Sequence, residues 1–578
     1  MKNQNLFFKL TLIAILLFSF FLYLYKNTEF PPSLFSDEVD INYQAFIFNN
    51  RNTDYFGNKF PIHFHSFVDW QPSFFIYSVA LIQKIVGHSD VSIRISSAIF
   101  GTLTILFFCL IIKELINNSV WSIIGGFLLS ITPWLFHFSR VGFAATNMLF
   151  LTLSGIYFWI KFIKTNKNKN LYLSLICFSL LTYSYSTAKL HLVFIFLSIF
   201  IIWFKTIIKI PIKTKFIAIF LIILISLPII VDTIKGRAGY RFSYINIFTD
   251  PTVSKTVDYL RYEDSIMVFG QQIGLKPMLI SKINHNKISQ WSETFIKNYF
   301  SAFSTEFLFL KGDCNLRQGV QTAGNLLYLD LFFIIIGISS IFVKKTPNHK
   351  FYLFFLFSLI FAPIPFSITR DSPSPHATRL ILMLPFLSLF SILGIKQIFK
   401  ITKSKIFISL ILFIYLLCFG RFLHQYYFHY PNNSARDWHF GMKEAVLTAI
   451  NSDYQQKYFA NYPESFTPFF LNYSEYLPSD KNISPTESFT SIDTSSFSGI
   501  KTESNYYLGH INWSNLFKDL PQNSLFVVPK QDLIIINNSL NDYNQNNSNK
   551  INFIEVSKIN QKYREQQEFY LITFKNEK

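Results

Sequence analysis

Long apolar runs recur through the first three quarters of this 578-residue chain and limit the folds open to it. About 20 apolar residues in a helix cross the hydrocarbon core of a bilayer. Eleven runs approach that length: 7–25, 95–112, 121–138, 146–162, 171–187, 190–204, 216–231, 326–343, 351–368, 380–395 and 406–422. The sequence therefore predicts an all-α polytopic membrane protein with eleven transmembrane helices.

The placement of lysine predicts how the chain sits in the membrane. Lys and Arg outnumber Asp and Glu by 52 to 34, and cytoplasmic loops are the ones enriched in them. With the N-terminus in the cytoplasm, the lysine clusters at 164–169, 205–215 and 396–405 fall in inner loops. The basic excess therefore indicates orientation in a plasma membrane, and no arginine-rich stripe indicates nucleic-acid binding.

This orientation places three regions on the outer face: 26–94, 235–323 and the chain after 423. It requires that the short run 74–86 does not cross. Gln83 and Lys84 within that run favour an interfacial or re-entrant helix. The first run, 7–25, lacks a small-residue cleavage site, which favours a retained signal anchor.

An acidic pair, Asp37-Glu38, follows soon after the first predicted span. Carboxylates this close to an outer membrane surface are either solvated loop residues or the reacting groups of an enzyme with a lipid-borne substrate. Asp69 offers a similar choice. It is either an acceptor-binding carboxylate or a cap for the helix that starts at Pro72-Ser73.

Two histidines in the same outer region are weak candidates for metal binding. His63 and His65 alternate along an extended stretch, so they share one face of it. Together with Asp37 or Asp69 they could hold a divalent cation. The alternative is that they are ordinary loop residues, because neither has a partner at helical or CxxC spacing.

Basic side chains stand at the outer ends of several predicted spans. They are Arg94, Arg140, Arg370, His376 and Arg379. An arginine fork binds phosphate oxygens through paired hydrogen bonds, which favours a lipid-phosphate role for Arg140 and Arg379. Juxtamembrane arginines also snorkel to the interface without a ligand, and we expect this of Arg94. Arg370 can instead pair with its neighbour Asp371.

The order of these motifs resembles that of the GT-C membrane glycosyltransferases, most closely glycosyltransferase family 39. The shared pieces are Asp37-Glu38, Asp69-Trp70-Gln71-Pro72-Ser73-Phe74, Arg94, Ser139-Arg140, Gly312-Asp313 and Pro375-His376-Ala377-Thr378-Arg379. The family contains the dolichyl-phosphate-mannose protein mannosyltransferases and is related to the aminoarabinose transferase of lipid A. The chain departs from many relatives at Gln71-Pro72, where they show a Pro-Pro or His-x-Pro step.

The resemblance implies an enzyme that moves a sugar from a polyprenyl-phosphate donor to an acceptor hydroxyl at the outer face. The departing phosphate needs charge neutralisation, and the hydroxyl needs a general base. The family pattern implies Asp37 as that base, with Glu38 orienting the acceptor or tuning Asp37. Direct attack with one base would invert the anomeric carbon. The implied substrate-binding residues are Asp69, Arg140, His376, Arg379 and Arg370.

The acceptor stays open among protein, glycan and lipid, and two other classes of protein are alternatives. A lipid-linked sugar flippase or transporter needs ionisable groups near the midplane of its spans, whereas Asp232 and Glu114 lie near span ends. A non-catalytic membrane scaffold gives no reason for acids in the first outer loop and cations at several span ends. The residues therefore favour the enzyme.

The composition changes after Tyr430-Pro431, where Asn, Ser, Asp and Gln become frequent and apolar runs stop. We expect a GT-C transmembrane domain over 1–431 and a soluble extracytoplasmic domain over 432–578, and the resemblance does not extend to the second of these. A helix at 438–450 and strands at 505–509, 524–528 and 569–574 predict a small mixed α/β domain. Its outer position suggests acceptor docking.

The outer connection 235–323 is too long for a plain loop. Its run 291–300 has amphipathic spacing. This pattern predicts a helix that lies on the membrane as a lid over the active site.

Overall fold

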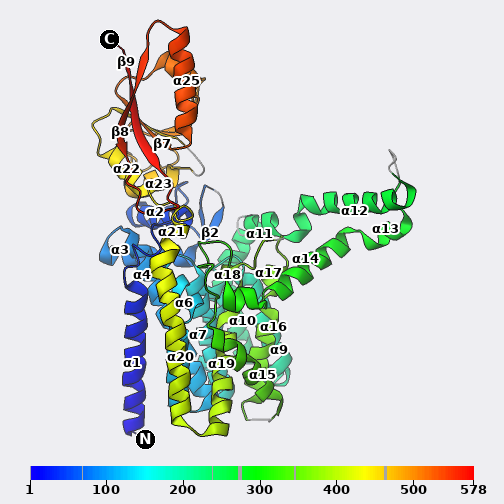
Figure 1. Ribbon diagram of the computed structural model, residues 1–578. Coiled ribbons are helices and arrows are strands. Elements are labelled where there is room, and N and C mark those ends of the chain that lie inside the picture. Colours follow the sequence, from blue (N-terminus) through cyan, green and yellow to red (C-terminus); the bar gives the residue numbers. More distant parts are fainter. Residues whose placement is uncertain are drawn as a thin grey trace.

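The computed structural model describes residues 2–67, 69–236, 239–270, 276–343, 347–370, 372–460 and 465–577. Apolar helices form a bundle, a small cap covers one end of it, and a β-sheet domain stands beyond the cap (Figure 1). A helical arm projects sideways near the capped end. The N-terminus lies at the opposite end of the bundle, and the C-terminus lies in the sheet domain (Figure 1).

Eight helices within the described residues are long and apolar enough to cross a membrane. They are α1 (Lys2–Leu24), α4 (Asp90–Ile116), α7 (Ala145–Thr165), α9 (Ala188–Ile208), α10 (Ile212–Ile234), α16 (His349–Phe361) continued by α17 (Ile364–Ser367), α19 (Met383–Thr402) and α20 (Lys405–His424). Each contains most of one predicted apolar run. The prediction of a mostly helical, multi-pass membrane protein is therefore confirmed.

The other three predicted spans form helices shorter than a full crossing. They are α5 (Ser119–Ser130), α8 (Asn168–Leu181) and α15 (Tyr328–Val343). The run 121–138 is divided because Pro133 lacks an amide hydrogen and begins a new helix, α6 (Pro133–Phe138). The run 74–86 forms α3 (Ser73–Val86), whose 14 residues fall short of a crossing, as expected.

Helices α15 and α19 approach each other closely through two glycines. A Cβ atom on Gly337 would lie 1.9 Å from the carbonyl oxygen of Phe390, and one on Gly394 would lie 2.0 Å from that of Phe333. Small residues allow membrane helices to pack with their backbones in contact. This contact joins the two helices on the side of the bundle away from α1 (Figure 1).

The connection 26–94 folds into the cap between the bundle and the sheet domain (Figure 1). Its main elements are α2 (Ser36–Arg51), β1 (His63–His65), β2 (Trp70–Pro72) and α3. Strands β1 and β2 pair antiparallel, with His63 opposite Pro72 and His65 opposite Trp70. The short helices α18 (Ala377–Leu380) and α21 (Tyr430–Ser434) stand at the same end of the bundle. The cap therefore holds Asp37 and Asp69 between the membrane part and the C-terminal domain.

The C-terminal domain is built on a seven-stranded sheet of order β4-β5-β6-β3-β7-β9-β8. The strands are β3 (Gln456–Ala460), β4 (Thr490–Asp493), β5 (Phe497–Lys501), β6 (Tyr506–Ile511), β7 (Ser524–Pro529), β8 (Ile551–Lys558) and β9 (Phe569–Asn576). Strand β3 runs parallel to β6 and β7, and the other pairs are antiparallel. The helices are α22 (Met442–Ile450), α23 (Thr467–Tyr473), α24 (Trp513–Leu516) and α25 (Asp532–Asn546).

The predicted mixed character of this domain is confirmed, and its predicted strands correspond to β6, β7 and β9. The predicted helix at 438–450 begins four residues late, at Met442. Gly441 precedes it with a φ of 103°, a conformation that a helix cannot include.

The C-terminal domain is fixed to the cap by buried polar contacts with α2. The side-chain amide of Asn42 donates to Asn472 at 3.0 Å, and the hydroxyl of Tyr43 donates to the carbonyl oxygen of Tyr476 at 2.6 Å. The cap and the domain also share one apolar core. The two parts therefore form a single unit around the space in which Asp37 lies.

The arm consists of α11 (Tyr240–Ile245), α12 (Pro251–Phe269), α13 (Leu279–Asn284) and α14 (Lys287–Ser301). The amphipathic run 291–300 is helical, within α14. The arm extends away from the bundle at the level of the cap (Figure 1). The structure thus does not place it as a lid over the site.

Candidate active site

Asp37 and Glu38 lie in the first turn of α2. The unpaired N–H groups of a helix N-terminus favour negative charge, and the N–H of Phe35 donates to Glu38 Oε2 at 3.3 Å. The acidic pair is therefore suited to beginning a helix. Its two carboxylates nevertheless have different environments, because Asp37 lines two cavities while Glu38 is fully buried.

Glu38 is enclosed by Arg94 and by the loop between α6 and α7. Its Oε2 lies 3.2 Å from Arg94 Nη2, and its Oε1 accepts the backbone N–H of Gly142 at 2.6 Å. Burial raises the pKa of the Glu38 carboxyl, and the charge of Arg94 acts in the opposite direction. Glu38 thus joins three parts of the chain. Glu38 is not among the described lining residues of either cavity, and its expected role of orienting the acceptor or tuning Asp37 stays a prediction.

Arg94 and Arg140 are both fully buried. Arg94 donates to the carbonyl oxygens of Asn27, Pro31 and Ser33, the last two at 3.1 and 2.5 Å. The prediction that Arg94 snorkels is therefore wrong. Arg94 lies at the end of a span, but the buried carboxylate of Glu38 pairs with its guanidinium and holds it inside the protein.

Arg140 holds the end of α1 in a similar way. It donates to the carbonyl oxygens of Leu22, Tyr23 and Phe30 at 3.1, 3.1 and 2.7 Å. These groups occupy the fork that was expected to bind lipid phosphate. The structure therefore places Arg140 inside the protein, where it fixes the chain that leads from α1 to Asp37.

The larger of the two cavities beside Asp37, here the outer cavity, has a volume of about 640 Å³. It lies between the cap and the C-terminal domain. Its lining residues are Ser36, Asp37, Asp40, Ser66, Phe67, Asp69 and Gln71 from the cap, and Ser465, Thr467, Pro468, Gly499, Ile500 and Leu508 from the C-terminal domain. Three carboxylates and several hydroxyls therefore face one space.

The smaller cavity, here the inner cavity, has a volume of about 90 Å³ and lies on the membrane side of Asp37. Its lining residues are Asp37, Ile41, Gln71, Pro72, Phe75, Ile76, Phe143, Ala144, Tyr185, Ser186, Gln318, His376 and Thr378. Asp37 and Gln71 belong to both linings. Asp37 therefore stands in the wall between a space toward the C-terminal domain and a space toward the spans.

Asp40 is a site residue that the sequence prediction missed. Its carboxylate accepts the hydroxyl of Tyr55 and, at 2.6 Å, the side-chain amide of Gln71. Burial raises the pKa of Asp40 to about 7, and the charges of Asp37 and Asp69 add to the rise. The signal was available, because a residue three positions after Asp37 lies on the same face of a helix.

His376 and Arg379 are held at the inner side of the site by the loop that contains Asp313. The Asp313 carboxylate accepts the N–H of Ala377 at 2.8 Å, and burial raises its pKa. The Nε2 of His376 lies 3.1 Å from Gln318 Nε2. Arg379 donates to Thr369 Oγ1 at 3.1 Å and is half-buried. The predicted His376 therefore reaches the inner cavity, whereas Arg379 does not line it.

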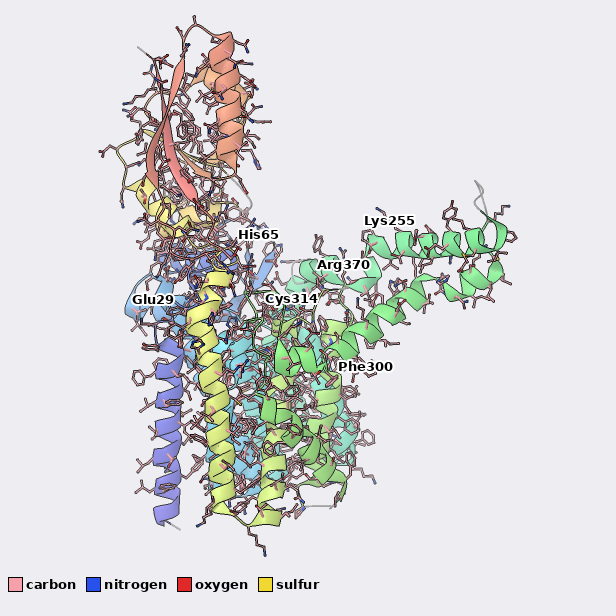
Figure 2. The ribbon with its side chains drawn as sticks, viewed as in Figure 1. Glu29, His65, Lys255, Phe300, Cys314 and Arg370 are labelled. Carbon is pink, nitrogen blue, oxygen red and sulfur yellow. The ribbon has the colours of Figure 1, made fainter. Side chains whose placement is uncertain are left out.

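Arg370 lies apart from both cavities, near the base of the arm (Figure 2). Its Nε is 3.9 Å from Asp250 Oδ2, and its guanidinium stands 5.1 Å from the ring centre of Tyr244. The expected partner Asp371 lies outside the described residues. The structure therefore links Arg370 to the arm rather than to the candidate site.

The two histidines of β1 have separate surroundings. His63 Nδ1 lies 2.5 Å from Asp232 at the outer end of α10, and His65 stacks on Trp70 with ring centres 4.1 Å apart. Within the described residues, no group of three His, Cys, Asp or Glu side chains is arranged to hold a metal ion. The described residues therefore do not bring His63 and His65, the two weak candidates, together in one metal site.

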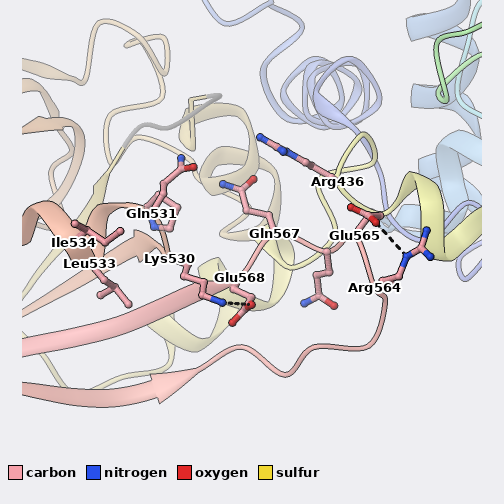
Figure 3. A pocket seen from close by; sticks show the side chains of 11 residues that line it. Arg436, Lys530, Gln531, Leu533, Ile534, Arg564, Glu565, Gln567 and Glu568 are labelled. Carbon is pink, nitrogen blue, oxygen red and sulfur yellow. Dashed lines mark hydrogen bonds and ion pairs between the residues drawn. The ribbon is translucent and has the colours of Figure 1, made fainter.

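A further cavity, of about 550 Å³, lies in the C-terminal domain away from Asp37 (Figure 3). Two of its acids are in ion pairs: Lys530 with Glu568 at 2.8 Å, and Arg564 with Glu565 at 3.1 Å. Hydrogen bonds from Lys530 and Lys558 lower the pKa of Glu568 to about 2. Because these acids are paired, we assign no chemistry to this cavity.

The sequence comparison and the bundle define the class of the protein: it is a membrane glycosyltransferase. Residues 71–231 match the family model of the dolichyl-phosphate-mannose-protein mannosyltransferases, which confirms the predicted resemblance over that segment. The matched segment begins at Gln71, so Asp37 lies before it. No curated protein matches the chain significantly.

Two solved structures are similar to this chain. One is ArnT from Cupriavidus metallidurans bound to undecaprenyl phosphate, with 9% identity, 97% of each chain covered and a TM-score of 0.44. The other is the oligosaccharyltransferase AglB from Archaeoglobus fulgidus in complex with an inhibitory peptide and a dolichol-phosphate. It has 12% identity and a TM-score of 0.47, and the match covers 92% of this chain and 70% of that one. Likenesses of this size carry no argument about function.

Proposed function

We propose that this protein transfers a sugar from a polyprenyl-phosphate donor to an acceptor hydroxyl at the outer face of a plasma membrane. The observation that carries the proposal is the position of Asp37 in the wall between two cavities. One cavity opens toward the C-terminal domain and the other toward the spans. A base at that place can reach an acceptor on one side and an anomeric carbon on the other.

The inner cavity suits the donor. Its wall contains apolar side chains such as Phe75, Ile76 and Phe143, next to the polar groups of His376 and Thr378. A lipid phosphate needs positive or hydrogen-bonding groups at its leaving oxygen and an apolar environment for its chain. His376, with Arg379 behind it, is our candidate for the phosphate side. The 90 Å³ of this cavity is small, so the donor has to widen it on binding.

The chemical step follows from one positioned carboxylate. Asp37 takes the proton of the acceptor hydroxyl as the acceptor oxygen forms its bond to the anomeric carbon. The bond from that carbon to the phosphate oxygen breaks, and its electron pair leaves with the lipid phosphate. A single displacement of this kind inverts the anomeric centre. Asp40 and Asp69 stand on the acceptor side, where they can accept hydrogen bonds from other hydroxyls.

The orientation of the chain agrees with an outer site. The lysine clusters 164–169, 205–215 and 396–405 lie at the end of the bundle opposite the cap. The positive-inside rule then gives a cytoplasmic N-terminus, a membrane domain over 1–431 and an extracytoplasmic domain over 432–578. Asp37 faces outward in this arrangement.

The decisive test is Asp37→Asn, because asparagine keeps the size of the side chain and removes the basic oxygen pair. We expect transfer from a radiolabelled polyprenyl-phosphate sugar by the purified variant to fall by about 10² to 10⁴. Binding of the donor lipid is expected to stay within about threefold, since cationic groups elsewhere hold the phosphate. Glu29→Gln, an exposed acid of the same outer region, is the matched control.

Wild-type turnover in Asp37→Asn would exclude Asp37 as the base. Lost donor binding with normal turnover of the bound fraction would make it a binding residue. Donor movement across the bilayer without transfer would indicate the flippase alternative.

A further inference from the structure

We propose that the outer cavity takes an uncharged sugar residue, so that the acceptor is a glycan, and that the C-terminal domain selects it. This inference rests on the proposed function and names the acceptor class for the same site. It is carried by the composition of the two walls of the outer cavity, which come from different parts of the chain.

The cap wall offers hydrogen-bond acceptors. Asp37, Asp40 and Asp69 line it together with the hydroxyls of Ser36 and Ser66. Carboxylates bind hydroxyl groups through short, charge-assisted hydrogen bonds, and several of them can hold several hydroxyls of one sugar ring. They disfavour an acceptor that carries phosphate, because like charges at close range reduce affinity. The described lining residues of this cavity include no Lys, Arg or His.

An aromatic ring completes the cap wall. Phe67 is 41% exposed and lines the outer cavity, while its ring packs against Tyr55 at 5.0 Å and Phe56 at 6.0 Å between ring centres. These contacts hold the ring in place with one part open to the cavity. A fixed ring beside carboxylates offers an apolar surface and polar acceptors together. The two faces of a sugar ring, with C–H groups and hydroxyls, match that combination.

The C-terminal wall is neutral. It consists of the hydroxyls of Ser465 and Thr467 and the apolar side chains of Pro468, Ile500 and Leu508, with Gly499 between them. No charged side chain belongs to this wall in the part of the chain that the structure describes. The wall therefore contributes shape and neutral hydrogen bonding, which are the properties that distinguish one neutral sugar from another.

The same wall disfavours a peptide acceptor. Extended peptides commonly bind by adding a strand to the free edge of a sheet. Part of the wall comes from Ser465 and the first turn of α23, and part from β5 and β6. Both strands are interior: β5 pairs with β4 and β6, and β6 pairs with β5 and β3. Their backbone groups are already used in the sheet. A volume of about 640 Å³ is instead typical of a small-molecule site, which suits a short piece of glycan.

The test uses the full-length protein in lipid nanodiscs with a radiolabelled polyprenyl-phosphate hexose. Three acceptors are compared: neutral methyl hexosides and disaccharides, a sugar phosphate, and a threonine-containing peptide. We expect the neutral sugars to give the highest kcat/KM. Asp69→Lys should raise the kcat/KM of the sugar phosphate relative to that of the neutral sugars, because it replaces a repelling charge with an attracting one.

The role of the C-terminal wall is tested by filling the cavity. Ile500→Trp should raise the acceptor KM about tenfold or more and leave the donor KM unchanged. Thr490→Trp is the matched control. Thr490 is exposed on the neighbouring edge strand, and its register partner Lys501 places it on the opposite face of the sheet from Ile500. Phe67→Ala is a second variant that creates no steric clash, and it should raise the acceptor KM in the same direction.

The outcomes separate the two proposals. If wild-type protein consumes no polyprenyl-phosphate sugar with any acceptor, the proposed function fails and this inference fails with it. If the donor is consumed but the peptide or the sugar phosphate is preferred, the proposed function stands and the glycan assignment is overturned. If Ile500→Trp and Phe67→Ala are both folded and keep the wild-type acceptor KM, the outer cavity is not the acceptor site.

Discussion

The two long connections at the capped end of the bundle, 26–94 and 235–323, differ in the kinds of side chain that they bury and expose. The first buries charged groups, with Glu38 and Arg94 at 0% exposure. The second forms the arm and exposes apolar groups, with Met267 at 84% and Leu279 at 76%. Both leave the same end of the bundle (Figure 1).

The difference indicates what each connection contacts. The first is held between the bundle and the C-terminal domain, where charges can be paired with carbonyl groups and fix the helix that carries Asp37. The second leaves the bundle sideways, and no part of the described chain covers its apolar face. A helix with such a face at the outer end of spans suits the interface of a bilayer. Four predictions test this contrast, beginning with the largest effect.

Arg94→Met should destabilise the protein most. It leaves Glu38 buried without its cation, and removal of one partner of a buried ion pair typically costs about 3–5 kcal/mol. Thermal unfolding in detergent should therefore shift far downward, whereas Lys84→Met, an exposed cation of the cap, should change little. The double variant Arg94→Met with Glu38→Gln should recover part of the loss. Equal stability of Arg94→Met and wild type would contradict the role of the pair.

Arg140→Met should have the next largest effect. The carbonyl oxygens of Leu22, Tyr23 and Phe30 lose their donor, at a cost of about 1–3 kcal/mol. The donor KM of the folded variant should stay near the wild-type value, because the guanidinium is buried away from the lipid. A raised donor KM with unchanged thermal stability would restore the phosphate role that the sequence predicted.

Asp40 should make stability depend on pH. Its pKa is about 7 in the folded protein and 3.8 for an exposed aspartate, so the folded state holds the proton more tightly. The stability that this proton contributes should therefore be fully present below about pH 4, fall as pH rises from about 4 to about 7, and be lost above that range. Asp40→Asn, which cannot lose a proton, should lack this part of the fall. Thermal unfolding of both proteins at pH 5 and pH 8 measures it, and identical pH profiles would contradict the assignment.

The sequence predicted the parts of the fold that depend on local pattern. Apolar runs located the eight long apolar helices of the described chain, because an apolar run of about 20 residues is a local pattern. The mixed sheet was recognised from three of its strands. Strands β3, β4, β5 and β8 were not predicted. Of these, β4 and β5 are short and largely polar segments that lack a clear alternation of apolar and polar residues.

Contacts between distant residues were not predictable from pattern. In the sequence, Arg94 and Arg140 stand at the ends of predicted spans, which is also where lipid-facing arginines are found. The carbonyl groups that surround both guanidinium groups come from other parts of the chain and are visible only in the fold. The outer cavity was not predictable for the same reason, because about half of its lining residues lie more than 400 positions beyond Asp37. Asp40 could have been identified from the sequence, because it follows Asp37 by three residues, a spacing that places both on one face of a helix.

The smallest effect is expected in the arm, and it concerns location rather than stability. Figure 2 labels Lys255 on the side of the arm away from the spans and Phe300 on the side toward them. Ile283 and Ile296, at 65% and 54% exposure, are large apolar side chains of α13 and α14 that the protein leaves open. Because these positions are exposed, Ile296→Ser should change the free energy of unfolding in detergent by less than about 0.5 kcal/mol.

In a bilayer the same positions should contact lipid. Single cysteines at 255, 283 and 296 would be labelled with a fluorophore after Cys314→Ser removes the exposed native thiol. In proteoliposomes, nitroxide-bearing lipids should quench the labels at 283 and 296 more than the label at 255, and aqueous iodide should show the reverse order. Iodide quenching of 283 and 296 as strong as that of 255 would show that the arm stands free in water. The two connections would then differ only in how their side chains pack, and the membrane would have no part in the difference.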